Sequence, residues 1–357
     1  NYRMPVEWAP HDATWLGWPA EPTDWPGKLL QAKWGMAEFV RMLTRDSVID
    51  GAPNERVEML CRNDEQRDEA AQMLDAAGVN MDRVRLHVFD TDRTWLRDCA
   101  PTFVRDTSTN TLVAIDWRFN GWARYPNHKK DDLVPTLVEK VAGVQRVEAV
   151  RPDNRERLVL EGGAIEISES GVVMVTEECL LDQERQCRNP GMSREDYDRA
   201  LKQYLGATRV VWLGIGATAD DTHGHIDDIA RFVPRKGTGG SGGKEVVVLA
   251  YEDDRYDENH EPSVENKKRL EREGFEVVTL PFPEAVTFEG ERLPASYANF
   301  YIANAGVLVP VFNDPRDKDA LDIVAAQFPD RPALPVYARD LVLGTGTLHC
   351  LSQQQPR

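Results

Sequence analysis

The sequence predicts an α/β fold in which β-rich modules repeat around a shared centre. Predicted strands and helices alternate along most of the 357 residues, and no linker rich in Pro or Ser divides the chain. We therefore expect one domain over residues 1–357. Strand edges followed by polar or Gly-containing residues also recur, near Trp18, Asp98, Glu161, His225, Asn304 and Cys350. A doubly wound parallel sheet is the alternative, but its crossovers need longer connections than several of these intervals allow.

The first part of the chain predicts a non-regular cover followed by alternating elements. Five of the nine tryptophans fall in residues 1–34, interleaved with prolines, which favours an ordered, non-regular segment over an apolar surface. Apolar residues at helical spacing predict a helix at 30–43. Capping residues and apolar runs predict strands at 57–61, 84–89 and 112–117, and helices at 63–78 and 133–142.

The same alternation continues towards the C-terminus. Ser193 with Asp196 marks a helix start and Gly206 its end, which predicts a helix at 194–205. The Gly-rich segment 236–244 is expected to be a flexible hairpin or loop; it lacks the Lys-Ser/Thr step of a phosphate-binding loop. Further strands are predicted at 158–160, 172–175, 209–213, 245–250, 276–280 and 307–312, and further helices at 262–274 and 315–328.

Composition and charge limit the class of partner. The chain is 41% hydrophobic and 29% charged, without an apolar run near the roughly 18 residues that a membrane span needs. Its net charge of −17 argues against a nucleic-acid partner and favours cationic ligands. Residues 1–10 lack the pattern of a signal peptide, and the five cysteines form no close-spaced pair. We therefore expect reduced thiols in a cytoplasmic protein with no membrane partner.

The C-terminal segment holds a candidate nucleophile. A turn rich in glycine, including Gly346, leaves room for close ligand approach before the pair His349 and Cys350, and a polar tail of three glutamines follows. Cysteine is most often a small core filler. This setting instead favours an exposed thiol of low pKa that acts as a nucleophile.

Two acidic residues lie at strand edges upstream. Arg97 and Asp98 could be a surface ion pair, but Trp95 lies three residues before the carboxylate. An acid beside an aromatic face suits a flat cation such as guanidinium. Glu161 follows three aliphatic residues and precedes two glycines, so we expect a cationic partner for a buried carboxylate, with a turn-capping role as the alternative.

The segment 220–228 is dense in ionisable groups. In a strand, His223, His225 and Asp227 would share one face. Two functional interpretations stay open: a divalent metal site, and a His that performs acid-base chemistry beside a carboxylate; the second is favoured. A solvated loop is the alternative without a functional role.

Several of these segments together resemble the agmatine deiminase family, also called the Porphyromonas-type peptidyl-arginine deiminase family. The similarity extends from about Met4 to Pro356 and is carried by residues 4–8, 15–19, 95–101, 160–163, 176–181, 188–190, 224–227, 299–304 and 346–356. The resemblance implies a five-bladed α/β propeller of pseudo-repeated ββαβ modules. It also implies hydrolysis of a guanidinium group without metal or organic cofactor.

Matched residue by residue, the resemblance implies a distributed site. Cys350 would be the nucleophile, His225 the general acid and base, and Asp98 and Asp227 the carboxylates that hold the guanidinium. Glu161 would be the remaining acid, near His225 and the substrate nitrogens. Substrate contacts are expected from Trp95, Asp98, Asp227 and Gly346. The chain departs from the family pattern at Ala100, His223, Thr345 and Thr347.

The resulting hypothesis is hydrolysis of agmatine to N-carbamoylputrescine and ammonia through a cysteine thiouronium intermediate. Free or peptidyl arginine shares the reacting group and is the alternative substrate. A metal-dependent hydrolase using His223, His225, Asp227 and His349, or a non-catalytic guanidine-binding module, are alternatives of other classes. We expect a homodimer or higher homo-oligomer.

Overall fold

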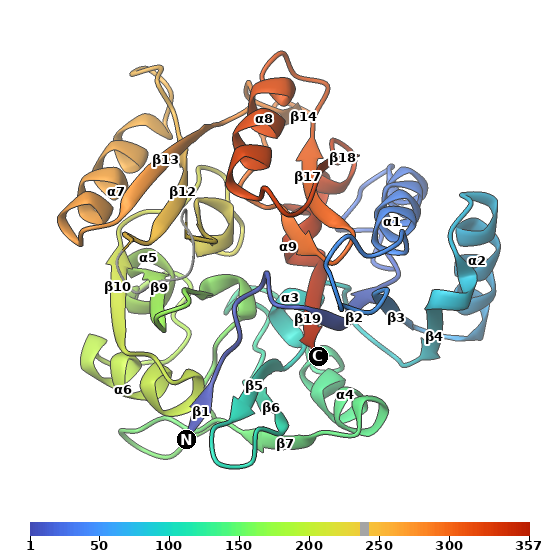
Figure 1. Cartoon of the computed structure of the whole chain (residues 1–357), viewed down its shortest axis with the longest axis horizontal. Helices are drawn as coiled ribbons and strands as arrows, with labels where there is room; N and C mark the ends of the chain where they lie inside the picture. Colours follow the sequence, from blue (N-terminus) through green and yellow to red (C-terminus); the bar gives the residue numbers. More distant parts are fainter. Residues whose placement is uncertain (236–242) are drawn as a thin grey trace.

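A computed structural model describes residues 1–235 and 243–357 and confirms a mixed α/β fold (Figure 1). Five sheets of three or four strands and one two-stranded sheet form in these residues. The larger helices lie on the outside of the molecule, and the short helices α3 (Leu96–Cys99) and α9 (Leu348–Leu351) lie near its centre. Most of the predicted Gly-rich loop, 236–242, lies outside the described residues.

One sheet joins the two ends of the chain. In the order β19-β2-β3-β4, strand β2 pairs antiparallel with β19 and parallel with β3. Its elements are β2 (His11–Gly17), α1 (Leu29–Leu43), β3 (Arg56–Cys61), α2 (Asp64–Ala76), β4 (Val84–Val88) and β19 (Ser352–Pro356). The prediction of a non-regular tryptophan-rich cover was therefore wrong for residues 11–17. Trp15 lies in the internal strand β2 and is completely buried, because packing its large indole ring in the core stabilises a regular strand there.

The second and third sheets follow along the chain. The sheet β1-β5-β6-β7 contains β1 (Tyr2–Arg3), β5 (Thr102–Asp106), β6 (Leu112–Asp116), α4 (Val134–Ala142) and β7 (Gln145–Glu148). The sheet β10-β9-β8 contains β8 (Glu166–Ile167), β9 (Val172–Thr176), α5 (Glu177–Leu181), α6 (Arg194–Leu205) and β10 (Arg209–Leu213). The predicted capping box of Ser193 and Asp196 forms at the start of α6, and Gly206 ends the helix with φ of 73°.

The remaining sheets have the same plan. The sheet β11-β12-β13 contains β11 (Ala230–Val233), β12 (Val246–Tyr251), α7 (His260–Arg272) and β13 (Glu276–Pro281). The sheet β16-β17-β18 contains β16 (Tyr301–Ala303), β17 (Gly306–Val311), α8 (Asp317–Gln327) and β18 (Ala333–Tyr337), and β14 (Thr287–Phe288) pairs with β15 (Glu291–Arg292). In each of the five larger sheets, an antiparallel pair is followed by a helix and a parallel strand. The parallel pairs are thus distributed over small separate sheets, and the doubly wound alternative is wrong.

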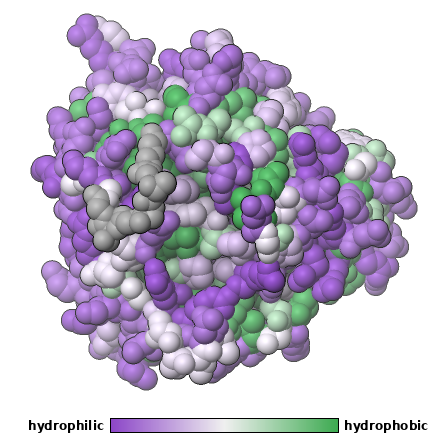
Figure 2. Space-filling view, in the orientation of Figure 1, coloured by the Kyte–Doolittle hydropathy of each residue, from purple (hydrophilic) through white to green (hydrophobic). Residues whose placement is uncertain are grey.

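The core lies between these sheets and their helices. One apolar cluster contains Trp15, Trp25 and Phe300, and a second contains Trp117 and Tyr197. Figure 2 shows that one face of the molecule is mainly hydrophilic, in keeping with the net charge of −17. Among the described residues, no helix has both the length and the apolar character that crossing a membrane requires. All five cysteines are unpaired.

Candidate active site

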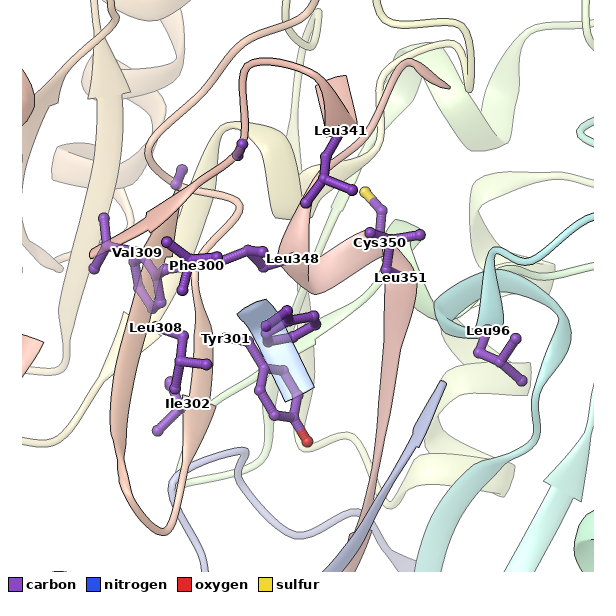
Figure 3. Packing of buried hydrophobic residues seen from close by; sticks show 14 of the residues in the cluster. Leu96, Phe300, Tyr301, Ile302, Leu308, Val309, Leu341, Leu348, Cys350 and Leu351 are labelled. Carbon is purple, nitrogen blue, oxygen red and sulfur yellow. The ribbon is translucent and has the colours of Figure 1, made fainter. Parts of the chain in front are cut away.

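Cys350 lies on the short helix α9, directly before β19 (Figure 3). The expectation of an exposed thiol was wrong, because only 3% of Cys350 is exposed. The polar glutamines that suggested exposure are themselves buried in β19, where Gln355 accepts a hydrogen bond from Trp15 Nε1 at 2.9 Å. A polar segment can occupy the interior when backbone pairing and side-chain partners satisfy its groups.

The environment of Cys350 also contradicts the expected low pKa. Burial raises the pKa of the thiol well above its ordinary value, and the charges of Asp227, Asp228 and Asp98 raise it further. A hydrogen bond from Asn299 acts in the opposite direction but is the weakest of these effects. Cys350 is therefore a thiol at neutral pH until a cation enters the site.

Asn299 holds the turn that carries Cys350. Its Nδ2 donates to Cys350 Sγ at 3.0 Å and to Asp228 Oδ1 at 2.9 Å. Its Oδ1 accepts from the backbone N–H groups of His349 at 3.1 Å and Cys350 at 3.3 Å, and from Thr347 Oγ1 at 2.8 Å. The sequence placed Asn299 in one of the stretches that resemble the family but gave it no role, because a single Asn between Ala298 and Phe300 carries no pattern that identifies such contacts.

His225 lies between two of the predicted acids. Its Nδ1 is 3.7 Å from Asp98 Oδ1, and its Nε2 is 3.9 Å from Glu161 Oε2. Burial opposes a charge on the ring, but the charge of Asp98 and contacts with Cys179 and Glu161 raise the pKa of His225 well above its ordinary value. The ring is therefore a cation at neutral pH that can donate a proton.

Asp98 lies on α3 rather than at a strand end. Its Oδ2 accepts from Trp122 Nε1 at 2.8 Å and its Oδ1 from the backbone N–H of Gly163 at 3.1 Å. Burial raises its pKa to about 6, against the lowering effect of His225. A Cβ atom at Gly163 would lie 2.5 Å from His225 Nδ1 and 2.9 Å from Asp98 Oδ1, so glycine is what allows these two groups to approach.

Glu161 has the cationic partner that its sequence position predicted. Arg188 Nε donates to Glu161 Oε1 at 2.9 Å, and both side chains are fully buried. Burial alone would raise the pKa of Glu161, but the charges of Arg188 and His225 lower it to about 2. The carboxylate is therefore ionised, and its second oxygen, Oε2, can accept a hydrogen bond from a ligand.

The predicted ladder of His223, His225 and Asp227 does not form. Asp227 lies in the 3-10 helix η4 (Ile226–Asp228), and His223 has φ of 67° and places its Nε2 2.5 Å from Asp182 Oδ2. Three sets of possible metal ligands converge in the described residues, and none combines the two histidines with Asp227: Glu161–Cys179–His225, Glu7–Glu166–His349 and Asp227–Asp228–Cys350. Residues 223 and 224 form a bend in which Gly224 has φ of 90°, so the strand alternation assumed for a metal site is absent.

Asp227 reaches the thiol. Its Oδ2 lies 3.5 Å from Cys350 Sγ and 2.6 Å from His349 Nδ1. Burial would raise the pKa of Asp227, but the hydrogen bond and charge of His349 lower it. Neighbouring Asp228 has its pKa raised well above the ordinary value by burial and by the charge of Asp227. One of these adjacent carboxyls is thus ionised and the other protonated at neutral pH.

A small cavity reaches Cys350. It is lined by Arg93, Trp95, Asp98, Trp122, Tyr125, Asp221, Thr222, Gly344, Thr345, Gly346 and Cys350. Of the residues predicted to contact substrate, Trp95, Asp98 and Gly346 line this cavity and Asp227 does not. Within this lining, Tyr125 donates to Asp221, and the guanidinium carbon of Arg93 lies 3.9 Å from the Tyr125 ring centre.

Several buried polar atoms around the thiol have no hydrogen-bond partner in the described part of the chain. They are Glu161 Oε2, His225 Nδ1, His225 Nε2, Asp227 Oδ1 and Asp228 Oδ2. Buried polar groups without partners are costly, so their concentration here indicates a place for a ligand or water. A guanidinium carries several N–H donors in one plane, which matches carboxylate oxygens next to a thiol.

Comparisons with known proteins relate the whole chain to one family. The family model described as Porphyromonas-type peptidyl-arginine deiminase matches residues 3–356. The chain is 32% identical to the agmatine deiminases of Stutzerimonas stutzeri and Ectopseudomonas mendocina, over 100% of this chain and 96% of each relative.

Solved structures are similar over the same extent. A variant of the C. jejuni agmatine deiminase with substrate bound superposes with a TM-score of 0.85 at 25% identity, covering 100% of this chain and 97% of that one. The agmatine deiminase of Enterococcus faecalis superposes with a TM-score of 0.83 at 26% identity, covering 100% and 96%.

Proposed function

This chain belongs to the Porphyromonas-type peptidyl-arginine deiminase family, and we propose that it hydrolyses agmatine to N-carbamoylputrescine and ammonia. It is an enzyme that cleaves a C–N bond of an amidine, as its agmatine deiminase relatives are named. The observation that best supports the substrate class is the set of buried carboxylates with free oxygens, Asp227 and Glu161, around a buried thiol.

The charges of the site support a substrate-dependent activation of Cys350. A bound guanidinium would neutralise Asp98 and Asp227 and add a positive charge next to Sγ, which favours the thiolate and releases its proton to water. The thiolate sulfur then attacks the central carbon. His225 gives its proton to the departing nitrogen, the C–N bond breaks, and ammonia leaves a thiouronium adduct on Cys350.

The second half of the reaction regenerates both groups. Neutral His225 takes a proton from water, and the resulting hydroxide adds to the thiouronium carbon. The C–S bond breaks, the thiolate returns, and the hydroxyl proton is lost as the ureido carbonyl forms. The protonated state of His225 is thus restored, and no redox step or cofactor is involved.

The lining of the cavity supports agmatine over arginine. At the end away from the guanidinium, agmatine carries an amine, whereas arginine carries a carboxylate beside its amine. Tyr125 and Asp221 line the cavity, and acidic or aromatic groups favour an ammonium. Arg93 also lines the cavity, but Asp24 forms a buried salt bridge with its guanidinium.

The repeated plan of the five larger sheets supports a five-bladed α/β propeller of ββαβ modules in a single catalytic domain over residues 1–357. In this arrangement, strand β19 from one chain end completes the module of β2 from the other. Homo-oligomeric assembly and a cytoplasmic location stay predictions, which sedimentation and cell fractionation would test.

The deciding experiment measures ammonia release from agmatine, free arginine and a blocked arginyl peptide under the same conditions. We expect turnover of agmatine at the highest kcat/KM. Preference for arginine or the peptide would assign a different substrate, and saturable agmatine binding without ammonia release would indicate a binding module.

The matched variant for this experiment is Cys350→Ala, which removes the sulfur and keeps the backbone. We expect no ammonia release above background, with agmatine binding retained. A Cys350→Ala protein that still releases ammonia at a normal rate would place the nucleophile elsewhere.

A further inference from the structure

His349 is a buried residue for which the reaction above has no role. It lies on α9 next to Cys350, and 1% of it is exposed. Its Nδ1 is 2.6 Å from Asp227 Oδ2, and its Nε2 is 2.7 Å from Glu7 Oε2. Each ring nitrogen therefore faces a carboxylate oxygen at hydrogen-bonding distance.

This geometry determines the protonation of the ring. An ionised carboxylate only accepts hydrogen bonds, so a short contact with each of two carboxylates requires a proton on both ring nitrogens. Burial raises the pKa of both carboxyls, but cations other than His349 lower it, Arg231 for Glu7 and both His225 and Arg231 for Asp227, so both groups are ionised. His349 is consequently an imidazolium.

The other charged groups around His349 agree with a cation at this position. Glu7 itself accepts from Arg231 at 2.7 Å and from the backbone N–H of Ile302 at 2.9 Å, so contacts other than His349 also hold it. Arg231 also donates to Glu166 at 3.2 Å. Arg97, on α3, contacts the backbone of His349 and not its imidazole ring. Its Nε donates to the His349 carbonyl at 3.2 Å, and its Nη1 donates to Gln354 Oε1 at 2.7 Å.

We propose that His349 is a positioning residue: an imidazolium, anchored by Glu7, that holds Oδ2 of Asp227 so that Oδ1 of the same carboxylate is presented to the guanidinium of the substrate. The proposal rests on the function proposed above. It extends the site to Glu7, near the start of the chain, to which the reaction described above assigns no role.

The observation that favours this role is that only one of the two Asp227 oxygens has a hydrogen-bond partner. Oδ2 is held by His349, whereas Oδ1 is buried and has no hydrogen-bond partner in the described residues. A rigidly held carboxylate binds a planar cation with less loss of conformational freedom. The imidazolium also offsets part of the negative charge of Asp98, Asp227 and Glu161 when no substrate is bound.

Two substitutions of His349 separate positioning from packing. In His349→Asn the amide nitrogen can occupy the place of Nδ1 and still donate to Asp227, whereas in His349→Gln it occupies the place of Nε2 and donates to Glu7. Loss of a hydrogen bond to a charged group corresponds to roughly 10- to 100-fold. We expect His349→Gln to lose about this factor in kcat/KM for agmatine, mainly through KM, and His349→Asn to lose clearly less.

The matched control is His87→Gln. His87 Nε2 is 2.7 Å from Glu58 Oε2, a His–carboxylate contact outside the site, so this variant keeps a donor to the carboxylate. We expect wild-type kcat/KM. Equal losses in both His349 variants, or no loss in His349→Gln, would overturn the proposal.

A measurement on the wild-type protein is independent of turnover. We expect the ¹⁵N spectrum of histidine-labelled protein under the assay conditions to show both ring nitrogens of His349 protonated, because each faces a carboxylate oxygen. A spectrum with one bare nitrogen would overturn the proposal even if both variants failed to fold. Failure of the proposed function would instead appear as absence of ammonia release by the wild-type enzyme, whatever the state of His349.

Discussion

Gly163→Ala tests whether the contact distances around His225 matter for the reaction. The substitution removes no functional group. It adds one Cβ atom that would lie 2.5 Å from His225 Nδ1, 2.9 Å from Asp98 Oδ1 and 3.2 Å from Asp227 Oδ2. Ordinary contacts of a Cβ atom begin near 3.4 Å, so the His225 ring must move by about 0.9 Å.

The expected loss follows from that displacement. Moving a catalytic group by about 1 Å costs on the order of 100-fold in rate. This factor corresponds to about 2.7 kcal/mol of activation free energy, at about 1.36 kcal/mol per factor of ten. Overpacking costs roughly 1–3 kcal/mol of folding stability as well, so the assay temperature must lie well below the unfolding transition.

The assay is ammonia release from agmatine by Gly163→Ala, with thermal unfolding recorded on the same samples. Gly214→Ala is the matched control, because the nearest atom to a Cβ there is Asn266 Oδ1 at an ordinary 3.5 Å. We expect wild-type activity from the control. A Gly163→Ala protein that folds normally and keeps kcat/KM within about threefold of wild type would refute the idea that close approach of His225 and Asp98 is required.

Two further predictions concern the thiol and its turn. Because burial and acidic neighbours raise the pKa of Cys350, its alkylation by iodoacetamide in the free enzyme should be slow at pH 7 and should increase only as the pH rises beyond the ordinary value of 9.0; rapid labelling at pH 7, followed by mass spectrometry of the Cys350 peptide, would contradict this. Asn299→Ala removes the acceptor for the N–H groups of His349 and Cys350, so we expect a loss of about 2–4 kcal/mol in urea unfolding and a lower kcat. An unchanged unfolding midpoint would show that the turn is held by other contacts.

Local patterns predicted much of the secondary structure. The helix beginning after Asn63 and the capping box of Ser193 depend on residues three positions apart, which interact within one helical turn. The prediction failed for residues 11–17 and for the three glutamines of β19. Their burial is decided by pairing between strands from opposite ends of the chain, and no local pattern contains that contact.

The properties of the candidate site likewise fall into those that residue types predict and those that depend on tertiary contacts. Residue types alone pointed to Cys350 as a nucleophile, because a thiol among glycines and polar residues is unusual for core packing. They also pointed to Asp98 and Glu161 as partners of a cation, because burying an unpaired carboxylate at an apolar strand edge is costly. Tertiary structure decided the rest: that the thiol is buried with a raised pKa, that Asn299 holds its turn, and that His349 contacts both Asp227 and Glu7. These properties depend on distances between segments far apart in the chain, and electrostatic and hydrogen-bond energies are set by those distances rather than by residue type.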